Sequence, residues 1–228
     1  MTSVRERVRQ EVTREILAAA RRQLATVGPV ALSLRAVARE VGMASSAVYR
    51  YFPSRDELLT ALIVEAYDEL GAAVERAEAA VPRDEHARRW QAVCRAAREW
   101  GLAHPHEFAL VYGTPVPGYV APERTVAAAT RVPQLLITLI RDALATDPPV
   151  PVPVEPPAAY GELLAAMGPQ VPAGRAVLGM MAWTWLIGRI GFELHGHLVG
   201  VVDPAAADAA FTWETTQTLT RLVTPAGG

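Results

Sequence analysis

Few side chains in this 228-residue sequence have the type and spacing that catalysis or metal binding requires. Cys94, the single cysteine, has no evident histidine partner that would make it a nucleophile. Glu193 and His197 would share a helix face, but His195 points elsewhere and a third metal ligand is missing. We therefore expect no enzyme, no metal and no cofactor. We interpret Glu193 as the partner of a histidine in a buried or interfacial hydrogen bond.

Side chains that bind phosphate gather near the N-terminus. Residues 1–55 hold ten arginines and four acidic residues, a net charge of +6. The remaining chain holds twelve arginines and twenty acidic residues, a net charge of −8. Because residues 1–55 are basic and the rest of the chain is acidic, we predict that only residues 1–55 contact a polyanion. Its phosphate-binding donors are Ser33, Arg35, Tyr49, Tyr51 and Arg55.

Two short helices joined by a tight turn are expected to position these donors. Apolar residues recur at helical spacing over Leu34–Val41, and Gly42 supplies a left-handed residue that ends this helix. Ser33 is expected to cap the first of the two helices. Ser45 is expected to cap the second, which should be about seven residues long. This is the helix-turn-helix pattern, which occurs in purely structural roles as well as in DNA binding.

The rest of the chain is also expected to be helical. Residues 3–14 are predicted to be a partly ordered arm, followed by a helix over residues 13–27. Ser54 and Glu57 have the spacing of a capping box, which predicts a long helix that ends near Ala80. Strand-like alternation is not found, so the fold class is all-α. Further helices are expected at residues 84–103, 107–112, 123–146, 173–200 and 204–223.

The predicted organisation is an N-terminal three-helix domain at residues 1–55 and a larger helical domain at residues 56–228. The six prolines of residues 147–157 predict an extended linker or a disordered loop. The apolar run 177–202 contains an arginine, a glutamate and two histidines, which favours a buried helix over a membrane span. With one cysteine and no apolar signal core, we expect a soluble cytoplasmic protein with no membrane contact.

The N-terminal motif resembles the signature of TetR-family transcriptional regulators. Residues 42–59 carry the closest likeness, Gly-Met-Ala-Ser-Ser-Ala-Val-Tyr-Arg-Tyr-Phe-Pro-Ser-Arg-Asp-Glu-Leu-Leu. The preceding segment Leu32–Val41 fits as well, and the resemblance covers residues 13–60. By position it implies phosphate contacts for Ser33, Tyr49 and Arg55, base-edge contacts for Arg35, Ser45, Ser46 and Ala47, and a backbone or base contact for Tyr51.

The residues expected at base edges are mostly small. Ser45, Ser46 and Ala47 offer little reach for direct readout of bases. The resemblance therefore leaves Arg35 as the expected base-reading side chain, with close fit and DNA shape adding to specificity.

The C-terminal half resembles the WHG type of TetR C-terminal domain through Trp183-x4-Gly188-x2-Gly191-x-Glu193-x2-Gly196-His197. The resemblance implies ligand binding and dimerisation for this domain. Gly196 and Gly200 form a small-xxx-small pair, which predicts close helix packing across a two-fold axis with Trp183 and Leu194. Large aromatic and methionine side chains predict a cavity for an apolar or aromatic effector. Its expected lining is Trp90, Trp100, Phe108, Tyr112, Met181 and Trp185.

The resulting hypothesis is a homodimeric transcriptional regulator that binds a palindromic operator. We expect a repressor that a small apolar effector releases. The main alternative is a helical small-molecule-binding or catalytic bundle whose N-terminal motif is structural. An architectural DNA binder without sequence preference is a third possibility.

Overall fold

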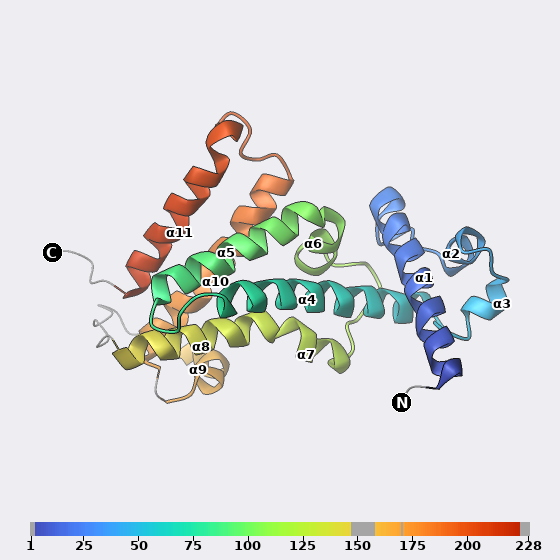
Figure 1. The fold of residues 1–228 in the computed structure, drawn as a ribbon, viewed down its shortest axis with the longest axis horizontal. Helices are drawn as coiled ribbons and strands as arrows, with labels where there is room; N and C mark the ends of the chain where they lie inside the picture. The colour runs from blue at the N-terminus through green and yellow to red at the C-terminus, as the bar shows by residue number, and fades with distance from the viewer. Residues whose placement is uncertain (1–2, 147–157, 170, 224–228) are drawn as a thin grey trace. The chain divides into compact units, whose positions relative to one another are not determined.

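The computed structural model describes residues 3–146, 158–169 and 171–223 (Figure 1). Every regular element in those ranges is helical, which confirms the all-α class. The proline-rich segment predicted to be a linker or loop, residues 147–157, lies outside the described residues.

The chain forms two compact units. The first unit is Met1–Glu69 with His104–Ala129, and the second unit is Leu70–Ala103 with Thr130–Gly228. The first unit takes in more of the chain than the predicted residues 1–55, because the beginning of a long helix and the segment after His104 pack with the N-terminal helices.

The first unit is built on a core that its three N-terminal helices share with the beginning of α4. Ile16, Leu17, Val37, Val48 and Leu58 belong to this core, and each is buried. The elements of the unit are α1 (Val4–Val27), α2 (Leu34–Glu40), α3 (Ser45–Val48), the beginning of α4 (Arg55–Ala79), α6 (Pro105–Tyr112), the 3-10 turn η1 (Glu123–Thr125) and α7 (Val126–Ala129).

Helix α1 begins at Val4, so the prediction of a partly ordered arm over residues 3–14 is wrong. Ser3 caps the helix, and its Oγ accepts a hydrogen bond from the backbone N–H of Glu6 at 3.2 Å. One turn later, Gln10 Nε2 donates to Glu6 Oε1 at 3.5 Å. The spacing of apolar residues could not predict that α1 begins at Val4, because residues 3–11 are all exposed.

The turn between α2 and α3 has the predicted glycine, since Gly42 has a φ of +67°. Ser33 occupies the N-cap of α2, but its side chain makes no capping hydrogen bond there. Ala44, and not the predicted Ser45, is the N-cap of α3, which spans four residues instead of about seven. The chain tightens into a turn after Val48, where successive N–H groups donate to carbonyls three residues back.

The predicted capping box is half formed. The backbone N–H of Glu57 donates to Ser54 Oγ at 3.1 Å, as expected. The Glu57 carboxylate does not complete the box, because it accepts from Arg124 Nη2 at 2.6 Å. Helix α4 nevertheless runs to Ala79, close to the predicted end.

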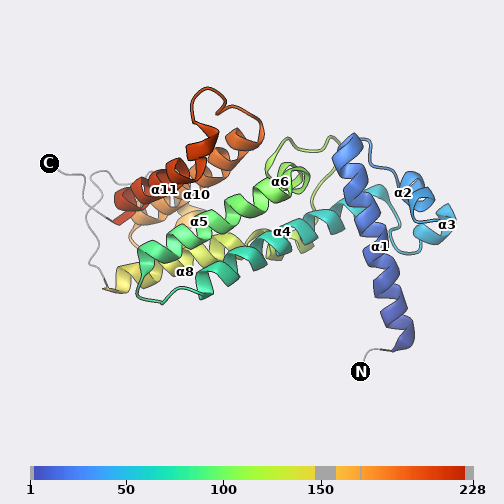
Figure 2. The same ribbon diagram turned by 45° about the horizontal axis from the view of Figure 1, so that its top comes forward.

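The second unit is a helical bundle arranged around α5 (His86–Ala103), which packs against α8, α10 and α11. Figure 2 shows α10 and α11 side by side, in agreement with their contacts. Trp90 Nε1 donates to the carbonyl of Thr215 at 3.0 Å and thereby joins α5 to α11. The other elements are the end of α4, α8 (Arg131–Thr146), η2 (Ala158–Tyr160), α9 (Gly161–Met167), α10 (Ala173–Leu194), η3 (Pro204–Ala206) and α11 (Ala207–Val223).

Glu193 is paired with arginines, so the predicted Glu–His hydrogen bond is wrong. Arg98 Nη2 donates to Glu193 Oε1 at 2.7 Å, and Arg189 Nη1 donates to Glu193 Oε2 at 3.0 Å. Hydrogen bonding by Arg98 lowers the pKa of Glu193 below its ordinary value, although burial opposes this. His195 and His197 are both exposed. Within the described residues, no group of three or more potential ligands could hold a metal ion.

Helix α10 ends at Leu194, six residues before the predicted end at Gly200. Gly196 and Gly200 have φ angles of +73° and +77°, so they lie in a turn and not on a helical stripe of small residues. The described part of the chain contains no helix with the length and apolar character needed to cross a membrane.

Candidate DNA-binding surface

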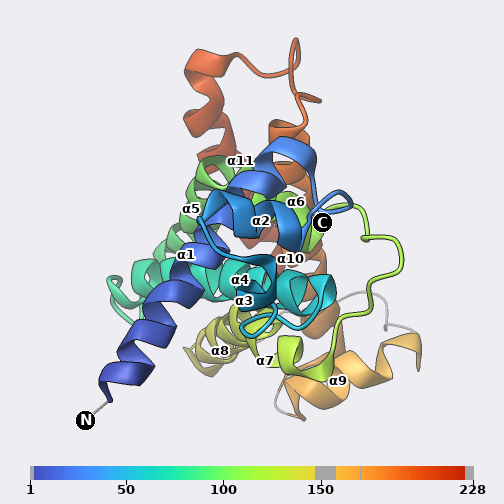
Figure 3. The same cartoon turned by 90° about the vertical axis from the view of Figure 1, so that its right-hand side faces the viewer.

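The predicted DNA-contact residues extend from the N-cap of α2 through α3 and the segment after it to Arg55, the first residue of α4 (Figure 3). Val48 and Phe52 are 0% and 7% exposed and hold this segment against the core of the first unit. The same anchoring leaves Ser45 and Ser46 exposed and Tyr49 42% exposed. Ala47 is half-buried beside them.

Arg35 and Ser33 border this surface from α2. Arg35 is exposed, and the described part of the chain offers it no ion pair or hydrogen bond. Ser33 is half-buried, and its backbone N–H donates to Gln23 Oε1 at 3.5 Å. The guanidinium of Arg35, exposed and unpaired among the residues described, can donate two parallel hydrogen bonds to a base edge or a phosphate.

Arg55 holds the loop between α1 and α2. Its Nη2 donates to the carbonyl of Pro29 at 2.7 Å and to that of Val30 at 3.1 Å. Its Nη1 lies 3.6 Å from Asp56 Oδ1. The structure therefore gives Arg55 a role in shaping the unit, and its contact with a phosphate stays a prediction.

Tyr51 is half-buried and is covered by Arg9 of α1, whose guanidinium carbon lies 5.7 Å from the centre of the Tyr51 ring. Arg5 of α1 and Arg50 line the same hollow. Sequence reasoning did not assign Arg5, Arg9 or Arg50. The i, i+4 spacing of Arg5 and Arg9 was the available signal, but it required α1 to begin before residue 5.

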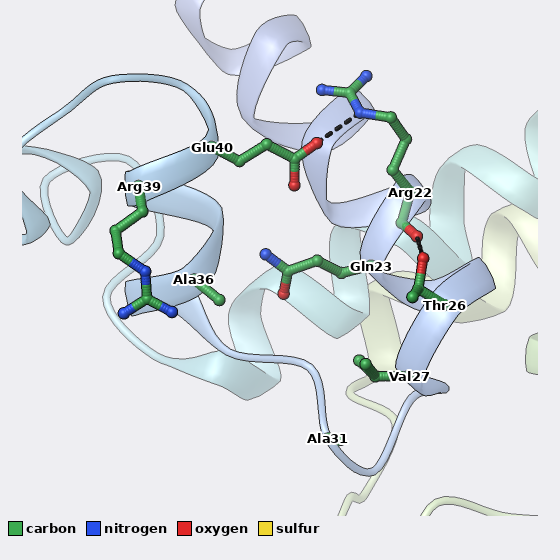
Figure 4. A pocket seen from close by; sticks show the side chains of 8 residues that line it. All are labelled: Arg22, Gln23, Thr26, Val27, Ala31, Ala36, Arg39 and Glu40. Carbon is green, nitrogen blue, oxygen red and sulfur yellow. Dashed lines mark hydrogen bonds and ion pairs between the residues drawn. The ribbon is translucent and has the colours of Figure 1, made fainter.

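A groove of about 560 Å³ lies between α1 and α2 (Figure 4). At its edge, Arg22 Nε donates to Glu40 Oε1 at 2.5 Å. The Glu40 carboxylate is neutralised by this pair, and none of the predicted DNA-contact residues lines the groove. The lining residues are Arg22, Gln23, Thr26, Val27, Ala31, Ala36, Arg39 and Glu40.

The residues predicted to line an effector cavity are divided between the two units. Trp90 and Trp100 are buried in the second unit. Phe108 and Tyr112 belong to α6 of the first unit, with ring centroids 5.1 Å apart. Burial raises the pKa of Tyr112, and the neighbouring Tyr67 adds to the effect.

Met181 and Trp185 come together on the surface of the second unit. They line a groove of about 370 Å³ on α10 and α11, together with Trp213. Met181 is 54% exposed and Trp213 is 65% exposed. The groove is therefore open and largely apolar.

The residues predicted at a dimer interface occupy two kinds of structure. Trp183 and Leu194 are half-buried on α10. Gly196 and Gly200 are exposed in the turn that follows. Cys94 is fully buried, and burial raises the pKa of its thiol well above the ordinary value, so it is not a reactive thiolate at neutral pH.

Two family models match the chain. Residues 90–218 match a model described as the tetracyclin repressor-like C-terminal domain, which spans more than half of the chain. Residues 16–62 match the model of bacterial regulatory proteins of the tetR family. The finer resemblance to the WHG type stays a prediction.

Named relatives agree with these models. The chain is 46% identical over 143 residues to the HTH-type transcriptional regulators Rv1816 of Mycobacterium tuberculosis and Mb1846 of Mycobacterium bovis. This match covers 62% of the chain and 61% of each relative, so the chain spans about three fifths of the length of the curated relatives it matches.

Solved structures are similar over nearly the whole chain. The putative regulatory protein SCO4313 is 32% identical with a TM-score of 0.70, covering 93% of this chain and 98% of that one. A protein of unknown function from Rhodococcus sp. RHA1 is 26% identical, also with a TM-score of 0.70, covering 92% and 94%.

Arg55→Lys tests the tie between Arg55 and the loop. Lysine keeps the charge but cannot reproduce the guanidinium geometry, so we expect the free energy of unfolding to fall by about 1 kcal/mol. Chemical denaturation followed by circular dichroism measures this loss. Arg50→Lys, at an exposed arginine of the same unit, is the control and should be neutral. Equal stability of both variants would contradict the tie.

Proposed function

Since the chain belongs to the TetR family of bacterial regulatory proteins, we propose that it binds a palindromic double-stranded DNA operator as a homodimer. It represses transcription there until a small apolar effector releases it. The family is one of regulators and not of enzymes. The observation that supports DNA binding best is the anchored α3, which turns Ser45, Ser46 and Tyr49 outward beside Arg35.

In this proposal, α3 and the turn after it enter the major groove. Ser45, Ser46 and Ala47 are small enough to let the backbone approach the base edges closely. Arg35 reads a base, for which guanine O6 and N7 are the best matched acceptors. Tyr49 donates its hydroxyl to a phosphate and fixes the register.

The homodimer places two such surfaces at half-sites about 34–36 Å apart, or a near multiple. We propose that a second copy covers the groove on α10 and α11. Its support is the open exposure of Met181 and Trp213, large apolar side chains that rarely gather on a monomer surface. Trp183 and Leu194 lie on the same α10, and Gly196 and Gly200 follow it, but none of the four lines this groove.

The regulator would exchange between an arrangement that binds the operator and one that does not. An effector releases the operator only if it binds the second arrangement more tightly than the first. Adaptable methionine and large aromatic side chains in the second unit favour an apolar compound. Met181 and Trp185, two of the predicted lining residues, border the groove assigned above to the second copy, so in this proposal the effector enters between the two copies.

Selection of duplexes from a random pool, followed by fluorescence anisotropy, tests operator binding. We expect the wild type to enrich a palindrome. Arg35→Ala should lose about 1–3 kcal/mol of discrimination between operator variants, whereas Tyr49→Phe should weaken binding to all duplexes alike. Equal losses on every duplex would make Arg35 a backbone contact, and unchanged affinity would remove Tyr49 from the phosphates.

Trp213→Glu tests the proposed dimer surface. A charge buried in an apolar interface costs several kcal/mol, so we expect monomers in analytical ultracentrifugation and a weaker hold on the palindrome. Val120→Glu, at an 86% exposed residue of the first unit, adds the same charge and should leave the dimer intact. A dimer that persists in Trp213→Glu would place the interface elsewhere.

A thermal-shift screen of apolar compounds tests the effector. A compound that stabilises the protein should also weaken operator binding, and Trp185→Ala should reduce its affinity about tenfold, ~1.4 kcal/mol. A compound that binds but leaves operator affinity unchanged would contradict the proposed coupling.

The competing functions give different results in the operator experiment. A small-molecule-binding bundle with a structural N-terminal motif would enrich no duplex. An architectural binder would hold all duplexes with similar affinity and a steep dependence on salt.

A further inference from the structure

We infer that the first turns of α1 form a second DNA-contact element, which binds backbone phosphates beside α3 through Arg5 and Arg9 together with Arg50. We call residues 3–12 the arm. The inference rests on the proposed DNA binding and adds a contact surface outside the helix-turn-helix motif.

Packing does not explain why the arm is helical. Residues 3–11 are all exposed, and Val12 at the end of the arm is its one residue that packs against the core of the first unit. The Ser3 cap and the hydrogen bond between Gln10 and Glu6 hold it in shape instead. Such a capped, solvent-exposed extension suits a surface that meets a partner.

One face of the arm looks onto the segment after α3. Arg5, Val8 and Arg9 share this face and, with Arg50 and Tyr51, line a hollow of about 590 Å³. The Arg9 guanidinium carbon lies 5.7 Å from the centre of the Tyr51 ring. This cation–π contact holds the Arg9 side chain in place and leaves its N–H groups free to donate to a phosphate. Because Arg50 and Tyr51 lie within three residues of the end of α3, a duplex that contacts α3 also meets this hollow.

The hollow carries excess positive charge. Arg5, Arg9 and Arg50 line it, and they make no ion pair within the described residues. Glu6 is the one carboxylate of the lining, and its Oε1 accepts from Gln10. Three guanidinium groups gathered near one carboxylate repel one another, and a row of phosphates relieves that repulsion.

A nucleic-acid backbone fits the arm better than a lipid surface does. A membrane-binding helix needs a broad apolar face with aromatic or leucine side chains. The arm exposes only Val4 and Val8 for this purpose, since Val12 packs against the core. Its chemistry is that of phosphate binding.

Helix α1 supplies a control on its opposite face. With 3.6 residues per turn, Arg7 and Arg14 lie on the face opposite Arg5 and Arg9. Arg14 Nη2 pairs with Glu11 Oε2 at 3.1 Å on that opposite face. Arg5→Gln/Arg9→Gln and Arg7→Gln/Arg14→Gln therefore remove the same charge from opposite sides of one helix.

Fluorescence anisotropy over a series of salt concentrations compares the two double variants on a selected duplex and on a random-sequence duplex. We expect Arg5→Gln/Arg9→Gln to weaken binding about tenfold or more and to reduce the slope of log affinity against log salt by about 2, since each phosphate contact contributes about 0.9. Arg7→Gln/Arg14→Gln should stay within about threefold of the wild type. Hydroxyl-radical footprinting should show backbone positions that the first double variant no longer protects.

If both double variants lost the same DNA affinity, the effect of the arm would be general electrostatic attraction, and the inference would be overturned. Unchanged DNA affinity in Arg5→Gln/Arg9→Gln would overturn it as well. Phosphate contacts do not depend on sequence, so the random duplex tests the arm even if the proposed operator fails. Equal wild-type affinity for both duplexes would count against the proposed operator alone. Circular dichroism melts check that both variants keep the wild-type fold.

Discussion

Burial of Val48 in the core of the first unit is the contact on which the candidate DNA-binding surface depends. A helix of four residues has no stability of its own in water, so α3 exists because its one buried side chain is held by the neighbouring helices. Phe52 fixes the following turn in the same way. With both residues held, the helical period turns the small polar residues and Tyr49 toward solvent.

Arginine serves opposite purposes in the two units. Around α3, arginines such as Arg35 are exposed and available to an anion. In the second unit several are buried and paired: Arg89 is 0% exposed and binds Glu78 and Asp142, which joins α4, α5 and α8.

The apolar period of the sequence was sufficient to predict the helical class, the Gly42 turn and the extent of α4. It failed where other forces define an element. The exposed start of α1 depends on a cap and not on burial, and the end of α10 depends on glycines in left-handed conformations that the hydrophobic pattern does not register. The Pro29 carbonyl that Arg55 binds and the Arg98 that pairs with Glu193 are distant in sequence, so no local pattern could identify them.

In the proposed mode of DNA binding, Ser45 and Ser46 could change the target sequence without changing the stability of the fold, because both are exposed. Their side chains take no part in the core, and surface substitutions of this kind usually change the folding free energy by no more than about 0.5 kcal/mol. A duplicated gene could therefore vary these positions and acquire a new target sequence while its product kept the same scaffold. Divergence of regulatory circuits would then require few substitutions and no compensating repair of the fold.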